Sequence, residues 1–500
     1  MKFYLRLPFV MLTMFLVYLF IDTYFKNRFI QPTRKKARAS ETKIVNKYRK
    51  AFLKRRMQLF VLNENITALK RKPTRKRFIK EIPNTNYRLS RLLYQLWDPN
   101  NYQNQGSMLS CGNLVSVDDK KYRQGRRFAR KLNRKFYEYV NVSDIWEAIK
   151  YSCLPVKNIF QYKTPNFGPA SYPIAYTITL DRTAEQSLRM LASIYHHDNI
   201  YCVHPNAKFG LLYMNIFKRI AECIPNIVVP EKIFAIRVKT YNHLKAEVGC
   251  FSKLLKSNVP WKYGINLPSS SFPLRNNTFI VKYLRSKPYE TSMTWELPNE
   301  RFMRRVRFVH VLKETEGETL LLRTAIQKSP PPDNLIIFRK GMYFISTRNF
   351  YTYITESNTA QKFLDWVEDT KSPEDFYYAT LYRYKYAPDG FPYDPSNEEI
   401  QLKKHRGTDD NVSRIPPSDL MLSLWKSDGA QRCHGQYRGH VCTFGAADLR
   451  WLIEQDYLFA ISFDYRVDRV SIDCLTKHLK QPILSDTYHD ENDWPTVKLG

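Results

Sequence analysis

Residues 172–204 run from YPIAYTITL (172–180) through AEQSLRMLASIY (184–195) to NIYCVH (199–204). The first and third segments are rich in β-branched and aromatic residues, which is typical of buried strands. The middle segment carries its apolar residues at helical spacing. A strand, a helix and a second strand in this order predict a βαβ unit, in which the two strands are parallel.

The same alternation continues after this unit. Further strands are expected at 227–229, 262–267, 306–312 and 342–345, and further helices at 243–255, 360–368 and 448–455. The pattern predicts an α/β fold with a mainly parallel sheet flanked by helices. Ligands of such folds bind beyond the carboxyl ends of the strands.

An uncharged apolar run, LPFVMLTMFLVYLFI, occupies residues 7–21. Its length fits both a short membrane span and the core of a signal peptide. No small-x-small cleavage site follows it, and apolar character continues through Tyr24 and Phe25, which favours a retained signal anchor. We therefore expect a cytoplasmic tail at 1–6, one transmembrane helix at 7–25 and a lumenal remainder, as in type II proteins.

The chain has 500 residues and a formal net charge of +32. Between residues 26 and 80 it carries 20 Lys or Arg and only two acids, so more than half of the excess charge lies in one segment. Such a run is typical of a solvated stem, expected here at 26–84, with a patch for anionic lipid or sulfated glycans as the alternative. A lumenal stem excludes nucleic acid as a partner.

Sequons and cysteines agree with a lumenal placement of the chain. N-x-S/T sequons occur at Asn65, Asn141, Asn276 and Asn411, where glycans are expected. The eight cysteines form an even set without zinc-type spacing, which favours disulfides in an oxidising compartment. The sequence therefore predicts a disulfide-bonded glycoprotein.

The chain contains no GxGxxG, GxxxxGK[ST], GxSxG, HExxH or D-x-D motif. One acidic segment stands out, KSPEDFYYAT at 371–380. It fits a helix N-terminus with Ser372 as N-cap, Pro373 at the first helical position and Asp375 as the carboxylate of a capping box.

Eight ordered matches also carry a wider resemblance: YPIAYTITL followed by IYCVHPNAK, KAEVGC, WKYGINLPSSSFPL, ETSMTWELPNERF, PPPDNLIIF, FLDWVEDTKSPEDFYYAT, VCTFGAADLRWL and SIDCLTKHL. Through them, residues 111–479 resemble the core-2/I-branching β-1,6-N-acetylglucosaminyltransferase family (glycosyltransferase family 14). The resemblance implies a variant GT-A fold for the lumenal domain, residues 85–500.

The resemblance also implies an activity. Such a transferase moves N-acetylglucosamine from UDP-N-acetylglucosamine (UDP-GlcNAc) to a C6 hydroxyl of an O-glycan or related glycan, with inversion and without a metal or other cofactor. The absence of D-x-D agrees with a metal-independent donor site. The disulfides implied by the family join Cys111 with Cys474, Cys153 with Cys223, Cys202 with Cys250, and Cys433 with Cys442.

The catalytic glutamate of the family falls at Asp375, with Glu374 directly before it. A carboxylate there takes the proton of the acceptor hydroxyl while the oxygen attacks. The resemblance assigns acceptor binding to Glu290 and Arg301. It makes Trp425 a candidate sugar platform, with ordinary core packing as the alternative.

On the donor side, the two basic residues of the family fall at Gly439 and Ser462. Arg438 and Arg466 lie close by in the sequence and are the candidate cations for the donor diphosphate. His204, in the IYCVHPNAK segment, is a further donor-binding candidate.

Two carboxylates of the family are also replaced here, by Asn206 and Ser271. Together with Gly439 and Ser462, these replacements support an alternative function, a non-catalytic lumenal glycan-binding pseudoenzyme of the same fold. A third possibility is a peptide xylosyltransferase, but only 26 residues follow Cys474, too few for the extra domain of those enzymes. The expected location is the Golgi membrane, and homo-oligomerisation stays open.

Overall fold

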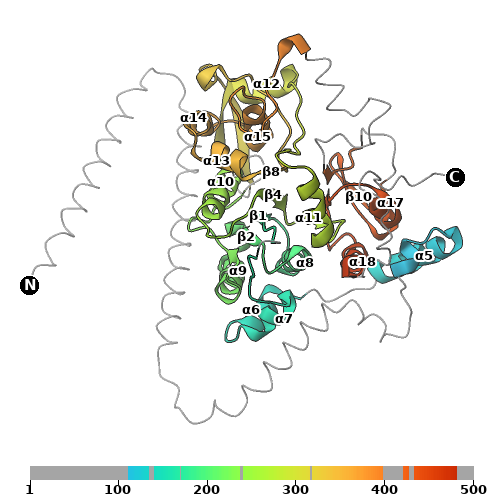
Figure 1. The fold of residues 1–500 in the computed structure, drawn as a ribbon. Coiled ribbons are helices and arrows are strands. Elements are labelled where there is room, and N and C mark those ends of the chain that lie inside the picture. The colour runs from blue at the N-terminus through green and yellow to red at the C-terminus, as the bar shows by residue number, and fades with distance from the viewer. Residues whose placement is uncertain are drawn as a thin grey trace, which may run out of the picture. The chain divides into compact units, whose positions relative to one another are not determined.

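The computed structural model describes residues 111–134, 140–168, 171–236, 240–315, 318–397, 420–426 and 433–480 (Figure 1). These residues all belong to one compact unit, 82–500. The expected tail (1–6), anchor (7–25) and stem (26–84) lie outside them. No helix within the described ranges is long and apolar enough to cross a membrane.

The centre of the fold is a five-stranded sheet with the order β3-β2-β1-β4-β8. Its strands are β1 (Ile174–Leu180), β2 (Ile200–Pro205), β3 (Ile227–Val228), β4 (Tyr263–Pro268) and β8 (Ile345–Thr347). The first four are mutually parallel, and only β8 runs antiparallel to its neighbour β4. The predicted βαβ unit and the mainly parallel sheet are therefore confirmed.

Strand β1 is buried along its whole length because both faces of the sheet are covered. Ile174, Tyr176 and Ile178 pack into a core shared with α8 and α9, whereas Ala175 packs into a second core with α10 and α13. Alternate residues of a strand point to opposite faces, and a strand buried on both faces reads as a nearly continuous apolar run. This is why YPIAYTITL lacks a polar side.

The described helices follow the strands in the order expected of an α/β fold. Their bounds are α4 (Cys111–Leu114), α5 (Asp119–Arg134), α6 (Val142–Ile149), α7 (Leu154–Phe160), α8 (Ala184–Ile194), α9 (Leu211–Cys223), α10 (Tyr241–Leu255), α11 (Asn277–Ser286), α12 (Glu300–Arg307), α13 (Arg348–Glu356), α14 (Asn358–Trp366), α15 (Glu374–Tyr382), α17 (Leu449–Glu454) and α18 (Arg469–Lys480). Short 3₁₀ turns occupy Ala207–Phe209, Pro332–Asn334, Pro395–Asn397 and Ala446–Asp448.

Three smaller strand groups surround the main sheet. Strands β5 (Ser271–Pro273), β12 (Phe459–Ile461) and β9 (Met421–Leu422) form a three-stranded sheet. Strand β5 begins shortly after β4 ends, so this second sheet lies at the carboxyl edge of the first. Two hairpins complete the set, β6 (Phe308–Thr315) with β7 (Glu318–Gln327), and β10 (Gln436–Arg438) with β11 (Val441–Thr443).

Two strand predictions differ from the structure. Val306 and Arg307 end helix α12, so the strand expected at 306–312 begins only at Phe308. This strand also pairs with β7 outside the main sheet. The strand expected at 342–345 begins only at Ile345. In both places a short apolar run fits more than one conformation, and tertiary packing chooses between them.

The four disulfides implied by the resemblance are present, and the described residues include no free cysteine. The bond between Cys202 and Cys250 ties β2 to α10. The bond between Cys111 and Cys474 ties α4 to α18 across a long stretch of sequence. The Cys202–Cys250 bond therefore ties a helix directly to the main sheet, whereas the Cys111–Cys474 bond joins two helices that are far apart in sequence.

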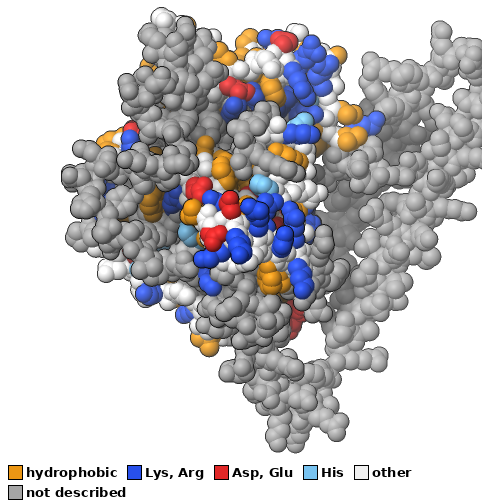
Figure 2. Space-filling view, turned by 90° about the vertical axis from the view of Figure 1, so that its right-hand side faces the viewer, with side chains coloured by type: hydrophobic (Ala, Val, Ile, Leu, Met, Phe, Trp, Pro, Cys, Tyr) orange, Lys and Arg blue, Asp and Glu red, His pale blue; other side chains and the backbone are white. Residues whose placement is uncertain are grey.

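The folded unit also carries a cluster of basic residues, in addition to those of the expected stem. Figure 2 shows a cluster of Lys and Arg side chains on the side that carries α5. The exposed cations of this helix are Lys120, Lys121, Arg123, Arg127, Arg130 and Lys131. Buried Ala129 and Leu132 turn the opposite face of α5 toward the core.

Candidate functional site

The carboxyl ends of β1 and β4 carry a polar cluster. Asp181 and Arg182 directly follow β1, and Ser269 directly follows β4. The Ser269 hydroxyl accepts a hydrogen bond from the Asp181 backbone N–H and donates one to the Asp181 carboxylate, both at 2.9 Å. Ligands of parallel sheets bind at this edge, so the candidate site is built around these residues.

Three arginines converge on one buried carboxylate at this edge. Asp464 is only 1% exposed, and its Oδ2 lies 2.6 Å from Arg438 Nη1, 3.0 Å from Arg466 Nη2 and 3.9 Å from Arg182 Nε. Burial alone would raise the pKa of Asp464, but hydrogen bonds from Arg466 and the charges of Arg466 and Arg182 outweigh it, so the pKa is lowered. Arg182 Nη1 also lies 2.7 Å from Asp181 Oδ2. The cluster therefore holds three cations and two carboxylates, and its net positive charge suits an anionic ligand.

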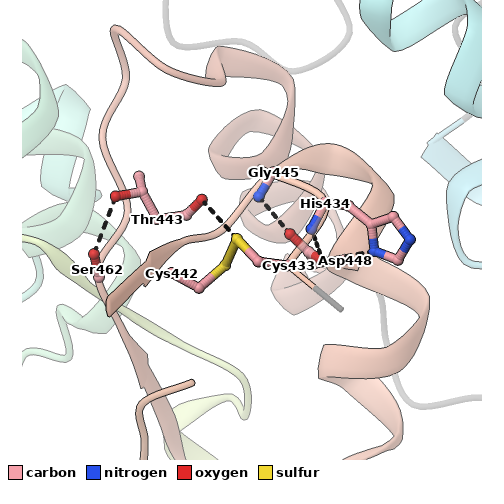
Figure 3. The surroundings of a disulfide bond; sticks show 7 residues. All are labelled: Cys433, His434, Cys442, Thr443, Gly445, Asp448 and Ser462. Carbon is pink, nitrogen blue, oxygen red and sulfur yellow. Dashed lines mark hydrogen bonds and ion pairs between the residues drawn. A yellow bond between two sulfur atoms is a disulfide. The ribbon is translucent and has the colours of Figure 1, made fainter. Parts of the chain in front are cut away.

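The position of Arg438 depends on the small hairpin β10–β11. The disulfide between Cys433 and Cys442 closes this hairpin, and Asp448 accepts hydrogen bonds from the backbone N–H groups of His434 and Gly445 (Figure 3). These bonds fix the chain on both sides of the hairpin. They place Arg438 on the same carboxylate as Arg466.

Ser462 and Gly439, where the resemblance expects cations, carry no charge. Both adopt positive φ angles, +84° at Ser462 and +61° at Gly439. The Ser462 hydroxyl lies 3.3 Å from that of Thr443 (Figure 3), which links the second sheet to the hairpin. Arg438 and Arg466 therefore supply the positive charge from neighbouring positions.

The acidic segment at 371–380 forms the start of helix α15, but not as a capping box. Ser372 has a φ of +54°, Pro373 is the N-cap residue, and no side chain caps the helix. The Asp375 N–H instead donates to the Ser372 carbonyl. This capping prediction is wrong because Ser372 adopts a left-handed conformation, and the Asp375 carboxylate is not used by the helix terminus.

Glu374 and Asp375 point into different surroundings. Glu374 is buried, with Oε1 3.7 Å from His243 Nδ1. Its Oε2 has no hydrogen-bond partner among the described residues. Asp375 keeps 24% of its side chain exposed, and its Oδ2 lies 2.5 Å from Arg305 Nη2. Asp375 is therefore the more exposed of the two carboxylates.

His243 lies between two glutamates near the carboxyl edge. Its Nε2 lies 3.6 Å from Glu247 Oε1, and Glu247 also accepts hydrogen bonds from Tyr378 and Asn266. Burial alone would lower the pKa of His243, but the charges of Glu247 and Glu374 and a hydrogen bond to Glu374 outweigh it and raise the pKa to about 9. His243 is thus a buried cation at neutral pH.

Tyr343 connects this histidine cluster with the arginine cluster. Burial raises the pKa of its hydroxyl well above the usual value, and the charges of Asp181, Glu247 and Glu374 add to the effect. The same hydroxyl feels the opposing charge of Arg182. Charges from both clusters therefore act on the Tyr343 hydroxyl.

The acceptor candidates lie in three places. Arg301 is an exposed residue of α12, one turn before Arg305, so it belongs to the helix that binds Asp375. Trp425 is 48% exposed and pairs through its backbone with Val441 of β11. Trp425 is therefore a surface residue rather than a core residue. Strands β10 and β11 form the hairpin that carries Arg438, called the arginine hairpin below.

Glu290 lies elsewhere. Its Oε1 is 3.8 Å from Lys287 Nζ, and the Lys287 carbonyl accepts a hydrogen bond from Tyr263 at the first residue of β4. This is the amino end of β4, separated from the carboxyl end by about 16 Å at roughly 3.3 Å per residue. The structure does not bring Glu290 together with Asp375.

Other positions predicted for the donor side are engaged within the fold. His204 is fully buried, its Nε2 accepts from the Phe234 N–H, and burial lowers its pKa to about 4. Asn206 hydrogen-bonds both the N–H and the carbonyl of Ile236. The Ser271 hydroxyl donates to the Pro268 carbonyl.

Two groups of side chains in the described ranges have metal-ligand spacing. His196, His197 and Asp198 directly precede Asn199 and β2, at the amino end of the sheet. The other group consists of Asp448 with Cys433 and Cys442, which are bonded to each other. Neither group belongs to the cluster at the carboxyl edge.

The sequons divide between described and undescribed residues. Asn141 and Asn276 are the N-caps of α6 and α11, where each side-chain oxygen accepts a backbone hydrogen bond. Such a cap uses Oδ1 and not the amide nitrogen to which a glycan is attached. Asn65 and Asn411 lie outside the described residues.

Several residues of the site were missed by the sequence reasoning. Arg182 directly follows a predicted strand, so the rule for parallel sheets already pointed to it. Asp464, His243 and Arg305 carried no such signal. Their partners are distant in sequence, and only the packing of α10, α12 and β12 brings them to the site.

Comparisons with known proteins identify the family of this chain. The family profile described as "Branch: Core-2/I-Branching enzyme" matches residues 174–453. A beta-1,3-galactosyl-O-glycosyl-glycoprotein beta-1,6-N-acetylglucosaminyltransferase 3 of Bos taurus is 30% identical over 63% of this chain and 69% of its own length.

Further relatives are named for the same activity. The corresponding transferase 4 of Danio rerio is 32% identical over 62% of this chain and 70% of its own length. The transferase 3 of Rattus norvegicus is 26% identical over 76% of this chain and 85% of its own length. The matched ranges include the parallel sheet, the start of α15 and the arginine hairpin, and on this basis the chain belongs to the Core-2/I-branching enzyme family.

Proposed function

We propose that this protein transfers N-acetylglucosamine from UDP-GlcNAc to the C6 hydroxyl of an O-glycan or related glycan, with inversion and without a metal ion. The observation that carries the proposal is the convergence of Arg182, Arg438 and Arg466 on Asp464 at the carboxyl edge of the sheet. The relatives are named for a transfer of this kind, which supports the same reaction. A signal anchor at 7–25 would hold the enzyme in the Golgi membrane.

In this proposal the arginine cluster binds the donor diphosphate. Arg438 and Arg466 are each about half exposed, so a diphosphate can approach both guanidinium groups from solvent. As the bond between the sugar C1 and the diphosphate breaks, negative charge grows on the leaving UDP. Preorganised guanidinium groups stabilise that charge.

Asp375 acts as the base. Its carboxylate takes the proton of the C6 hydroxyl while the hydroxyl oxygen forms the new bond to C1 and UDP leaves. Arg305 holds the carboxylate in place through the contact at 2.5 Å. Arg301 on the same helix and Trp425 near the hairpin are the candidate contacts for the acceptor glycan.

The test uses the full-length protein with UDP-GlcNAc and a Galβ1,3GalNAc acceptor in EDTA, with product read by mass. Product that disappears in Asp375→Asn supports the proposal, and product that requires added metal contradicts metal independence. UDP-xylose with a peptide acceptor is the comparison donor. Transfer of xylose in place of N-acetylglucosamine would favour the xylosyltransferase.

A second candidate function is a non-catalytic glycan-binding protein of the same fold. It is favoured by the donor-side positions Asn206 and Ser271, whose side chains are occupied by backbone hydrogen bonds. A measurement of UDP binding distinguishes the transferase from the pseudoenzyme. The pseudoenzyme predicts that UDP does not bind, whereas the transferase predicts binding that depends on Arg438 and Arg466.

A further inference from the structure

A pocket of about 430 Å³ opens at the amino end of the main sheet, at the opposite end of β4 from the arginine cluster. Its walls come from the start of β4, the end of α11 and the β8–α13 junction. The side chains that matter for its chemistry are Tyr172, Trp261, Lys262, Arg285, Tyr289 and Arg348. Pockets of this size and mixed composition are typical of small-molecule sites.

Tyr289 is the most unusual residue of the pocket. Its side chain is 72% exposed, although it is a large aromatic residue. Its φ is +67°, in the left-handed region that bulky residues rarely adopt. Backbone strain of this kind concentrates at ligand-binding positions. Here it presents a free aromatic face at the mouth of the pocket.

Two cations frame a second aromatic ring of the pocket. Arg285 lies 5.1 Å and Lys262 lies 5.8 Å from the ring centroid of Tyr172. Both cations are exposed. The Tyr172 ring is half-buried, and burial raises the pKa of its hydroxyl, against the charge of Arg285.

The lining of the pocket is positively charged. Lys262, Arg285 and Arg348 line it, and no carboxylate does so among the described residues. Arg348 is fixed by hydrogen bonds to the Val259 and Leu255 carbonyls and lies over the Trp261 ring.

The acids nearest to the pocket face other groups. Glu290 at the rim lies beside Lys287, and Asp389 accepts from Thr347. Neither neutralises Lys262, so a ligand in the pocket meets net positive charge.

We propose that this pocket binds an acidic sugar, with its anionic group on Lys262 and Arg285 and its ring on Tyr289. Charge-assisted hydrogen bonds from the cations hold a carboxylate or sulfate, and an aromatic face packs against the apolar face of a sugar ring. The site does not depend on the proposed transferase activity, because it lies at the other end of the sheet.

The experiment measures binding of small sugars to the full-length protein by calorimetry. The acidic probes are methyl glucuronide and N-acetylglucosamine 6-sulfate, and methyl glucoside is the neutral comparison. We expect at least one acidic probe to bind at least tenfold more tightly than methyl glucoside. Lys262→Ala should weaken that binding by about tenfold or more. Arg438→Ala should leave it unchanged, which excludes binding at the arginine cluster.

Tyr289→Gly separates a lost ligand contact from a lost fold. Glycine tolerates the positive φ, so this variant should keep or raise the melting temperature while binding of the acidic probe falls. Equal binding of acidic and neutral probes, or no binding of either acidic probe, overturns the proposal. So does acidic-sugar binding that survives both Lys262→Ala and Tyr289→Gly.

Discussion

Arg305 and Asp375 form an ion pair at 2.5 Å that joins the last turn of α12 to the first turn of α15. The Arg305 guanidinium also donates to the Lys371 and Ser372 carbonyls and lies over the Phe376 ring. One side chain therefore fixes both the position of the candidate base and the chain that leads into its helix. This arrangement makes the two residues separable by experiment.

Asp375→Asn should lower transfer by about 100- to 10,000-fold, the range typical of a lost general base. The amide keeps the shape of the side chain but cannot accept the proton. Glu374→Gln is the matched comparison and should cost much less activity, because Glu374 is buried beside His243. Initial rates and melting temperatures of both variants check this. A larger loss of activity in Glu374→Gln than in Asp375→Asn would mean that Glu374 is the base.

Arg305→Ala should lower the free energy of unfolding by about 1 to 2 kcal/mol, from the lost ion pair and the lost ring contacts. It should also lower transfer by up to about 100-fold, because a base that shifts by an ångström loses its alignment. Arg304→Ala on the same helix is the control, since Arg304 is exposed and 3.9 Å from Glu300. Equal effects of the two variants would contradict a positioning role for Arg305.

Arg438→Ala and Arg466→Ala should each weaken UDP binding by about tenfold or more, since a charge-assisted hydrogen bond contributes about 1.5 to 3 kcal/mol. Calorimetric titration with UDP measures the change. Arg450→Ala on α17 is the control, because Arg450 pairs with Asp119 of α5 at 2.8 Å. If both site variants bound UDP as tightly as the unchanged protein, the diphosphate would have to bind elsewhere.

Stability should fall as the pH rises from about 6.5 to about 9. The pKa of His243 is raised to about 9 in the fold, whereas an unfolded histidine titrates near 6.5. The folded state therefore binds the proton more tightly, and the stabilisation is complete below about 6.5 and lost above about 9. The shift corresponds to up to about 3 kcal/mol.

His243→Gln tests the origin of that pH dependence. The variant should be less stable at pH 6 and should lose most of the change between pH 6.5 and 9. Chemical unfolding at several pH values provides the comparison. An unaltered pH profile in the variant would mean that another group is responsible.

Gly435→Ala should destabilise the protein by about 1 to 3 kcal/mol through overpacking. A Cβ at this position would collide with the Thr443 carbonyl, on the strand that faces it in the hairpin. Gly249→Ala within α10 is the contrasting change, because nothing lies near its Cβ. It should stabilise the helix by about 0.5 to 1 kcal/mol. Thermal unfolding of both variants checks the two signs.

Local patterns in the sequence were sufficient for the parallel sheet. The apolar run at 172–180 and the helical spacing at 184–195 each determine one element, and short connections leave few ways to join them. The boundary near Val306 was not predictable in this way, since the same apolar residues fit a helix end and a strand start. The left-handed Ser372 was equally hidden, because a Ser-Pro pair also fits a capped helix.

The candidate site shows the same division. Asp375 and Glu374 were identified from the sequence as neighbours, but their different roles were not, because only the positions of α10 and α12 give one carboxylate His243 and the other Arg305. Glu290 was grouped with Asp375 by resemblance. The structure instead places it at the amino end of β4, beside Lys287.

The sequence by itself determined the α/β class, the βαβ unit and, through its resemblance, the pairing of the cysteines. These follow from periodicity and from motifs that are contiguous in the chain. Only the tertiary structure decided that Arg182, Arg438 and Arg466 share Asp464. Arg182 and Asp464 are far apart in sequence, and such contacts depend on how the two sheets pack at one edge, which no local pattern encodes.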